Sequence, residues 1–240
     1  MSYMENKNNK IALLIDGDNA QPKLLKPILE ESSKYGKVTI RRIYGDWTKP
    51  QMNGWKDILN ELAFNPIQKF SYTTGKNSTD SALIIDAMDI LHDSSVDGFC
   101  IVSSDSDYTG LAKRIREEGT FVMGIGEKKT PGAFVKSCEI FTFCENLESL
   151  IIPEKVLKEN KKSKPYLSLI DKAFDMSVNE SDEAYVATIG LNIRKLDPSF
   201  DSRTYGYKSL TSLLSGIQGY ELIDNFVNGL NHPLFRKKIK

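Results

Sequence analysis

The chain has 240 residues, of which 40% are hydrophobic and 27% charged, and its 32 Lys+Arg balance 32 Asp+Glu. This composition is typical of one large globular domain or two small ones, and the zero net charge excludes a global basic field for nucleic acid. Three Cys without a CxxC spacing and two His exclude a Cys/His zinc site.

The N-terminal residues, Met1 to Lys10, do not resemble a signal peptide, and no apolar run in the chain reaches membrane-spanning length. The scattered Cys residues suit a reducing compartment. We therefore predict a cytoplasmic protein.

The first part of the chain, residues 8–150, is predicted to form an α/β domain. Apolar runs typical of strands occur at 10–15, 38–44, 66–72, 98–102, 121–126 and 140–143. Helical patterns alternate with them at 22–36, 55–62, 80–91, 109–115 and near 133–135. Strands that alternate with helices of this length predict βαβ units, and hence a parallel sheet covered by helices on both faces.

The composition changes after this domain. Residues 151–164 are rich in Lys and are predicted to be a linker, and a second module is predicted at 165–235. Apolar spacing predicts helices from Leu167 to Phe174, from Ala184 to Leu196 and from Leu210 to Ile217, followed by a strand at 220–223 and a turn at Asn228-Gly229. Three helices and a small hairpin indicate a winged-helix module.

Four acids lie at the ends of predicted elements. Asp16 ends the first strand, Asp105 and Asp107 follow the strand at 98–102, and Asp80 begins a helix. Because neighbouring strands of a doubly wound sheet end in one crevice, we expect these side chains to converge there. Clustered carboxylates raise one another's pKa, and a divalent cation relieves their repulsion. Oxygen ligands favour Mg²⁺ or Mn²⁺, and such a site suits phosphodiester hydrolysis.

Each of these residues also has a simpler interpretation. Asp80 is suited to cap its helix, and Asp16 to form a tight strand-to-helix turn. Asp86, Asp89 and Asp93 share a stripe on the helix at 80–91, which we interpret as its solvent-facing side and leave out of the site.

Two polar residues near the acids have similar alternatives. Asn19 is placed to orient Asp16 or a ligand water, or to hold a local turn. Lys76, in the polar turn before Asp80, is placed to bind a substrate phosphate or to be a solvated lysine.

Three ordered motifs resemble those of the NYN domain, the LabA-like branch of the PIN-like nucleases. They are Asp16–Asn19, Lys76–Met88 and Val102–Tyr108, and the resemblance covers about residues 10–147. It implies a PIN-like parallel sheet and metal-dependent ribonuclease activity. By matching position it implies Asp16, Asp80, Asp105 and Asp107 as the catalytic, metal-binding acids, with Asn19 and Ser104 supporting them. Ser104 stands where many relatives have Gly, and Tyr108 where many have Phe.

The second module resembles the OST-HTH (LOTUS) domain, a winged-helix family associated with RNA binding and with protein partners. The resemblance rests on Tyr205–Leu214 followed by Tyr220–Ile223, and it covers about residues 165–232. Residues 165–235 contain 5 Lys+Arg and 9 Asp+Glu, so a broad phosphate-binding face is not evident.

The leading hypothesis is an endoribonuclease that hydrolyses single-stranded or structured RNA with Mg²⁺ or Mn²⁺. A non-catalytic RNA-binding or adaptor protein with a residual acid cluster is the alternative. A haloacid-dehalogenase-like phosphatase ranks last, because Asp16 and Asp18 supply its Asp-x-Asp spacing without the Thr that should follow. The oligomeric state and the ligand of the second module stay open.

Overall fold

The computed structural model of the chain describes residues 9–70, 78–148 and 166–238. They belong to two compact units, which divide between Ile152 and Pro153. The predicted linker at 151–164 lies outside the described residues, and the domain bounds 8–150 and 165–235 remain predictions. Across the three described ranges, every helix is too short or too polar to cross a membrane.

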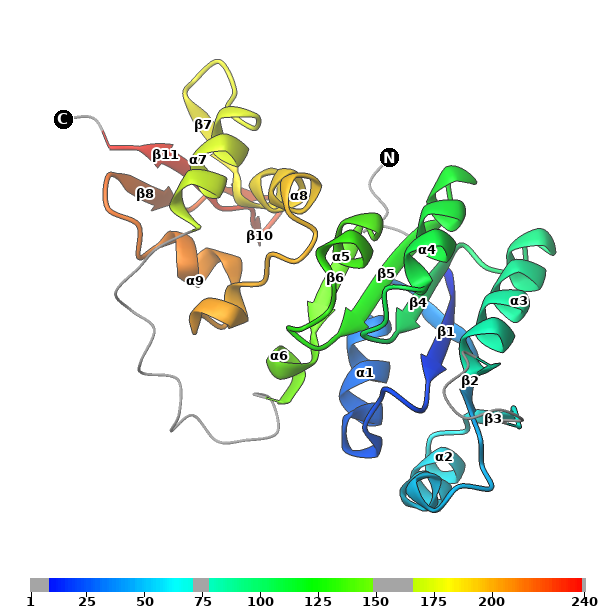
Figure 1. Cartoon of the computed structure of the whole chain (residues 1–240). Coiled ribbons are helices and arrows are strands. Elements are labelled where there is room, and N and C mark those ends of the chain that lie inside the picture. Colours follow the sequence, from blue (N-terminus) through cyan, green and yellow to red (C-terminus); the bar gives the residue numbers. More distant parts are fainter. Residues whose placement is uncertain (1–8, 71–77, 149–165, 239–240) are drawn as a thin grey trace. The chain divides into compact units, whose positions relative to one another are not determined.

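The first unit alternates strands and helices along the chain (Figure 1). Its strands are β1 (Lys10–Asp16), β2 (Lys37–Gly45), β3 (Asn65–Gln68), β4 (Gly98–Val102), β5 (Phe121–Gly126) and β6 (Ile140–Phe143). Its α-helices are α1 (Leu25–Ser32), α2 (Lys56–Glu61), α3 (Ser78–His92), α4 (Tyr108–Glu117), α5 (Gly132–Ser137) and α6 (Cys144–Glu148). Two 3₁₀ helices, η1 (Pro22–Leu24) and η2 (Pro50–Trp55), precede α1 and α2.

The six strands form one parallel sheet in the order β3-β2-β1-β4-β5-β6. The predicted parallel sheet is therefore confirmed. The chain builds outward from β1 to β3, then returns to place β4 on the other side of β1. This reversal makes the β1–β4 edge the switch point, where the carboxyl ends of the strands open a crevice.

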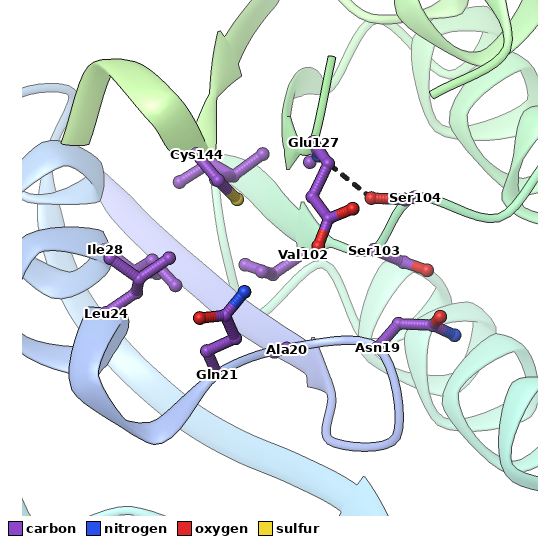
Figure 2. A pocket seen from close by; sticks show the side chains of 12 residues that line it. Asn19, Ala20, Gln21, Leu24, Ile28, Val102, Ser103, Ser104, Glu127 and Cys144 are labelled. Atoms are coloured by element: carbon purple, nitrogen blue, oxygen red, sulfur yellow. Dashed lines mark hydrogen bonds between the residues drawn. The ribbon is translucent and has the colours of Figure 1, made fainter. Parts of the chain in front are cut away.

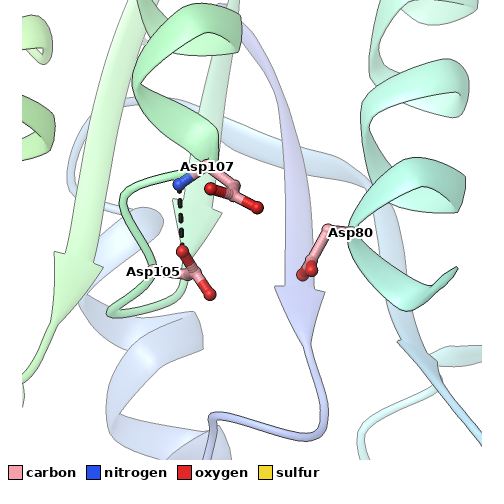
Figure 3. Close-up of side chains that lie close together, drawn as sticks. All are labelled: Asp80, Asp105 and Asp107. Carbon is pink, nitrogen blue, oxygen red and sulfur yellow. Dashed lines mark hydrogen bonds between the residues drawn. The ribbon is translucent and has the colours of Figure 1, made fainter. Parts of the chain in front are cut away.

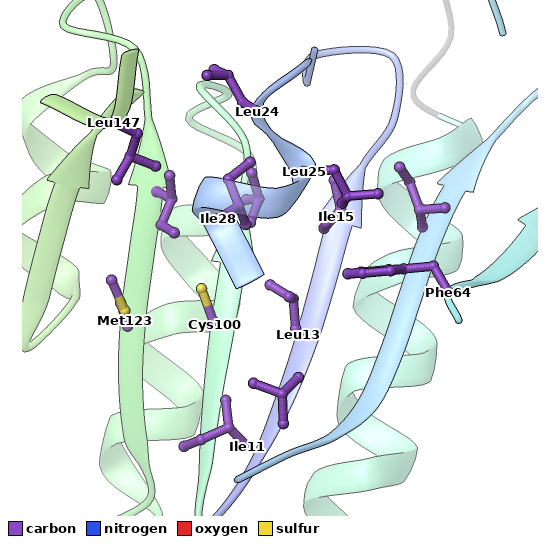
Figure 4. Packing of buried hydrophobic residues seen from close by; sticks show 14 of the residues in the cluster. Ile11, Leu13, Ile15, Leu24, Leu25, Ile28, Phe64, Cys100, Met123 and Leu147 are labelled. Carbon is purple, nitrogen blue, oxygen red and sulfur yellow. The ribbon is translucent and has the colours of Figure 1, made fainter. Parts of the chain in front are cut away.

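Both faces of the sheet are covered by helices. Ile11, Leu13 and Ile15 of β1 belong to a buried cluster with α1, η2, α2 and α6 (Figure 4). Ala12 and Leu14 face the opposite cluster, which α3, α4 and α5 complete. Because both faces are covered, all residues of β1 from Ile11 onward are buried, which explains its unbroken apolar run.

The prediction that Asp86 faces solvent was wrong. Asp89 and Asp93 are exposed, but the Asp86 side chain is only 24% exposed and forms an ion pair with Arg42. Its second oxygen accepts a hydrogen bond from the hydroxyl of the buried Tyr44. Strand β2 runs beneath α3 and supplies both partners, so this Asp86 network fastens α3 to the sheet with charge-assisted hydrogen bonds.

The end of β5 requires a residue without a side chain. A Cβ on Gly126 would lie 2.5 Å from the carbonyl oxygen of Ser103 and 2.7 Å from Oγ1 of Thr130. Those distances are shorter than van der Waals contact, so Gly126 lets the loop after β4 close against β5. Gly110 in α4, by contrast, has no atom within 4 Å of its hypothetical Cβ.

The second unit contains helices around a small antiparallel sheet. Its helices are α7 (Leu167–Asp175), α8 (Val186–Leu196), η3 (Ser202–Tyr205) and α9 (Leu210–Leu214). Its strands are β7 (Glu183–Tyr185), β8 (Tyr220–Ile223), β9 (Phe226–Val227), β10 (Leu230–Asn231) and β11 (Leu234–Lys237). The order β7-β11-β8 forms one sheet, and β9 pairs with β10 to extend the hairpin between β8 and β11. Phe174, Phe235 and Ile189 are in its core.

The expected turn at Asn228-Gly229 forms the tip of this hairpin, with positive φ at both residues (51° and 80°) as in the hairpin turns that favour Asn-Gly. The predicted extent of two helices was wrong. Ala184 lies in β7, opposite Phe235 of β11, so the helix begins only at Val186. Ile217 lies beyond the end of α9, although it is buried in the same core.

Candidate active site

Three of the four predicted acids meet at the switch point. Carboxylate oxygens of Asp80, Asp105 and Asp107 all lie within 4.8 Å of one another (Figure 3). Asp80 comes from the first turn of α3, whereas the other two come from the loop between β4 and α4. These residues are far apart in the sequence, and they meet because β4 ends beside β1 and α3 packs on the same face as α4.

The loop after β4 is shaped by its own side chains. The backbone N–H of Asp105 donates to Oγ of Ser103 at 3.1 Å, and the N–H of Asp107 donates to Oδ1 of Asp105 at 3.0 Å. Local hydrogen bonds of this kind from Ser and Asp are typical of tight turns. They fix the backbone of the loop at Asp105 and Asp107 and the orientation of the Asp105 carboxylate.

Asp16 is fully buried at the end of β1. Its carboxylate accepts hydrogen bonds from Nδ2 of Asn19 at 2.7 Å and from Oγ of Ser103 at 3.0 Å. Burial raises the pKa of Asp16, and the negative charge of Asp80 raises it further, while these two hydrogen bonds oppose the shift. Asp16 is not a member of the group of three acids, so its role as a metal ligand remains a prediction.

The surroundings of Asp80 disfavour a negative charge on its carboxylate. Partial burial raises the pKa of its carboxyl, and the charges of Asp105 and Asp107 add to this shift. A hydrogen bond from the hydroxyl of Tyr108, at 2.7 Å, lowers the same pKa. A cation beside the three acids would remove the repulsion that these shifts report.

Asn19, Ser104 and Lys76 were predicted to assist the acids, and the structure describes the first two. Asn19 contacts Asp16, as expected. Ser104 accepts a hydrogen bond from the backbone N–H of Glu127 at 2.9 Å and so ties the loop after β4 to the end of β5 (Figure 2). Its supporting role at the acids remains a prediction. Lys76 lies outside the described residues.

Two residues that contact the acids were missed. Ser103 holds Asp16 and the loop after β4, and Tyr108 reaches Asp80. Both lie inside the motif Val102–Tyr108, but the sequence does not reveal which hydroxyl of the Ser103-Ser104 pair faces inward. A recess of about 10 Å³ lies between Asn19, Ser103 and Glu127 (Figure 2), which is room for about one water, and its lining does not include the clustered acids.

The donor set of this site fits a hard divalent cation. The three clustered ligand atoms are all carboxylate oxygens, which are the ligands that Mg²⁺ and Mn²⁺ prefer. Since the acids lie within a few ångströms of one another, one ion is able to contact more than one of them. The predicted metal site is thus compatible with the geometry.

Comparison with protein families identifies both units. The NYN domain family matches residues 10–149, and the OST-HTH/LOTUS domain family matches residues 156–225. The first match covers more than half of the chain. Both resemblances found in the sequence motifs are therefore confirmed, and the six-stranded sheet flanked by helices fits a PIN-like NYN fold.

Individual proteins from three organisms are similar to parts of this chain. An uncharacterized protein of Methanocaldococcus jannaschii is 26% identical over 180 residues, which cover 73% of this chain and 70% of that protein. A crystal structure of a Vibrio parahaemolyticus protein of unknown function is similar with a TM-score of 0.49 and 21% identity, over 58% of this chain and 94% of that one. A solution structure of an uncharacterized Nitrosomonas europaea protein is similar with a TM-score of 0.31 and 27% identity, over 37% of this chain and 87% of that one.

Proposed function

This chain belongs to the NYN-domain family, and on that premise we propose that it is a metal-dependent endoribonuclease. The observation that carries the proposal is the convergence of Asp80, Asp105 and Asp107 at the switch point of the sheet. The OST-HTH/LOTUS domain, a kind associated with RNA binding, supports RNA as the substrate.

We assign the metal site to Asp80, Asp105 and Asp107, and we propose Asp16, which is buried at the end of β1, as the fourth metal-binding carboxylate. When bound, Mg²⁺ or Mn²⁺ supplies charge stabilisation at a phosphodiester and lowers the pKa of a water nucleophile. The protein contributes the carboxylates, because Ser103 and the turn hydrogen bonds hold the Asp105 side chain and the loop that carries Asp107 before any substrate arrives. Preorganised charges of this kind need little rearrangement during the reaction.

The proposal is tested by comparing cleavage of a labelled, partly single-stranded RNA by the wild type and by Asp105→Asn, in Mn²⁺, in Mg²⁺ and in EDTA. We expect metal-dependent cleavage by the wild type and loss of cleavage in the variant. Asp89→Asn, which removes an exposed acid from α3, is the matched control and should cut normally. No cleavage by the wild type, or equal cleavage by wild type and Asp105→Asn, would refute the assignment. DNA of the same sequence tests the preference for RNA.

The second candidate is an RNA-binding adaptor, and one observation favours it. Phe226 and Leu230 on the hairpin of the second unit are 69% and 66% exposed, and residues 225–235 contain no Asp, Glu, Lys or Arg. Exposed apolar side chains on an uncharged hairpin indicate a contact surface that does not need the acids. If the wild type binds RNA in EDTA but never cuts it in either metal, the adaptor is the better description.

A further inference from the structure

Tyr108 places a hydroxyl at the acids from inside the protein. It is the first residue of α4, its side chain is 0% exposed, and its ring packs against Phe134 with 6.3 Å between ring centroids. It belongs to the buried cluster on the face that α3 covers, together with Leu83 and Ala87 of that helix. A ring enclosed in this way has little freedom, so its hydroxyl is held at a fixed point.

That point lies within hydrogen-bond distance of one of the clustered carboxylates. The hydroxyl donates a hydrogen bond to Oδ1 of Asp80 at 2.7 Å. An ordinary tyrosine hydroxyl is protonated at neutral pH, so it is the donor in this hydrogen bond to Asp80.

The hydrogen bond joins the two elements that carry the acid cluster. Asp80 belongs to α3, while Tyr108 directly follows Asp107 in the chain and lies three residues after Asp105. A link from Tyr108 to Asp80 thus fixes α3 relative to the loop after β4. It occupies one oxygen of Asp80, and the carboxylate is thereby oriented with respect to Asp105 and Asp107.

From this geometry we infer that Tyr108 is a positioning residue of the metal site, whose hydroxyl sets the orientation of Asp80 and thereby the affinity for the ion. The inference rests on the proposed function, because it requires that the acids bind a divalent cation. Hydrogen bonds to ligand carboxylates typically change metal affinity by about 10- to 100-fold when they are removed.

The test uses the full chain and the variant Tyr108→Phe, which keeps the buried ring and removes only the hydroxyl. Tyr220→Phe is the matched control, because it removes a Tyr-to-Asp hydrogen bond of 2.9 Å, to Asp171, in the other unit. Asp80→Asn serves as the ligand variant. Mn²⁺ binding is measured from the electron paramagnetic resonance signal of free Mn²⁺, the thermal midpoint is measured in EDTA, and RNA cleavage is measured across a Mn²⁺ titration.

We expect Tyr108→Phe to weaken Mn²⁺ binding by about 10- to 100-fold, while Tyr220→Phe binds as the wild type does. The variant should require correspondingly more Mn²⁺ for cleavage and recover its rate at saturating Mn²⁺, which a general loss of structure would not allow. If Tyr108→Phe binds Mn²⁺ within twofold of the wild type while Asp80→Asn loses binding, the positioning role of Tyr108 is overturned and the metal site stands. Absence of Mn²⁺ binding in the wild type would instead overturn the metal site itself.

Discussion

Because the three clustered acids repel one another, we predict that Asp105→Asn is more stable than the wild type without metal and less stable than the wild type with metal. The variant keeps an oxygen to accept the hydrogen bond from Asp107, but removes one charge and hence two repulsive pairs. At 4.8 Å, two unit charges repel by about 0.9 kcal/mol in water and about 3.5 kcal/mol at an effective dielectric constant of 20. Because Asp105 is half-buried and Asp107 exposed, the lower figure is the better guide, which gives about 2 kcal/mol for both pairs.

The assay is thermal unfolding of the full chain in EDTA and in Mn²⁺. In EDTA, about 2 kcal/mol should raise the midpoint of the first unit by about 4–8 °C in Asp105→Asn. In Mn²⁺ at 100 times its dissociation constant, the wild type should gain about 2.7 kcal/mol from binding, and the variant should gain much less. The order of stability of the two proteins should therefore reverse between the two conditions.

Asp89→Asn is the control, because it removes one exposed acidic charge from the same unit without touching the cluster. It should stay close to the wild type in both conditions. If Asp105→Asn is no more stable than the wild type in EDTA, the acids do not repel one another as their separation requires. If it gains as much from Mn²⁺ as the wild type, the ion does not bind at Asp105.

Three further predictions follow from the fold and the pKa shifts. Asp86→Ala should lower the free energy of unfolding, measured in urea, by about 2–4 kcal/mol, because it leaves Arg42 and the buried hydroxyl of Tyr44 without this partner. Its control, Asp89→Ala, removes an exposed acid from the same helix and should change that free energy by less than about 0.5 kcal/mol. Gly126→Ala should lower the free energy of unfolding by about 1–3 kcal/mol, because the added methyl group meets the loop after β4. Gly110→Ala places its methyl group in open space within a helix and should raise the free energy of unfolding by about 0.5–1 kcal/mol. Because the pKa of Asp80 is raised, the folded protein binds more protons there than the unfolded chain does, so in EDTA its contribution to stability should fall as the pH rises through the raised pKa. The difference in unfolding free energy between the wild type and Asp80→Asn, measured against pH, reports this contribution.

Each of these has an outcome that would contradict it. Equal losses in Asp86→Ala and Asp89→Ala would mean that the Asp86 network does not fasten α3. A Gly126→Ala protein as stable as Gly110→Ala would mean that the loop after β4 moves away from the added methyl group without loss of free energy. A difference between the wild type and Asp80→Asn that does not vary with pH would mean that the carboxyl of Asp80 has its ordinary pKa in the folded protein.

Several features of this protein were determined by local sequence. The apolar run that ends at Asp16 identified a strand buried on both faces, because only a covered strand excludes polar residues from both of its sides. The alternation of strands and helices then placed Asp16, Asp80 and Asp105 at one edge of a parallel sheet, which the structure bears out for their positions. The turn at Asn228-Gly229 was evident because few other residues accept two successive positive φ angles.

The surroundings of individual side chains, in contrast, depend on how remote segments pack together. Asp86 had the spacing of an exposed stripe, yet β2 brings Arg42 and Tyr44 beneath it. Ala184 fitted a helical pattern, but pairing with Phe235, about fifty residues later, makes it part of a strand.

The hydroxyl of Tyr108 and the buried state of Asp16 depend in the same way on distant elements. Periodicity along the chain reports which face of a segment is covered. It does not report which polar group from a remote segment lies opposite a given side chain, and that partner decides its charge, its pKa and its role.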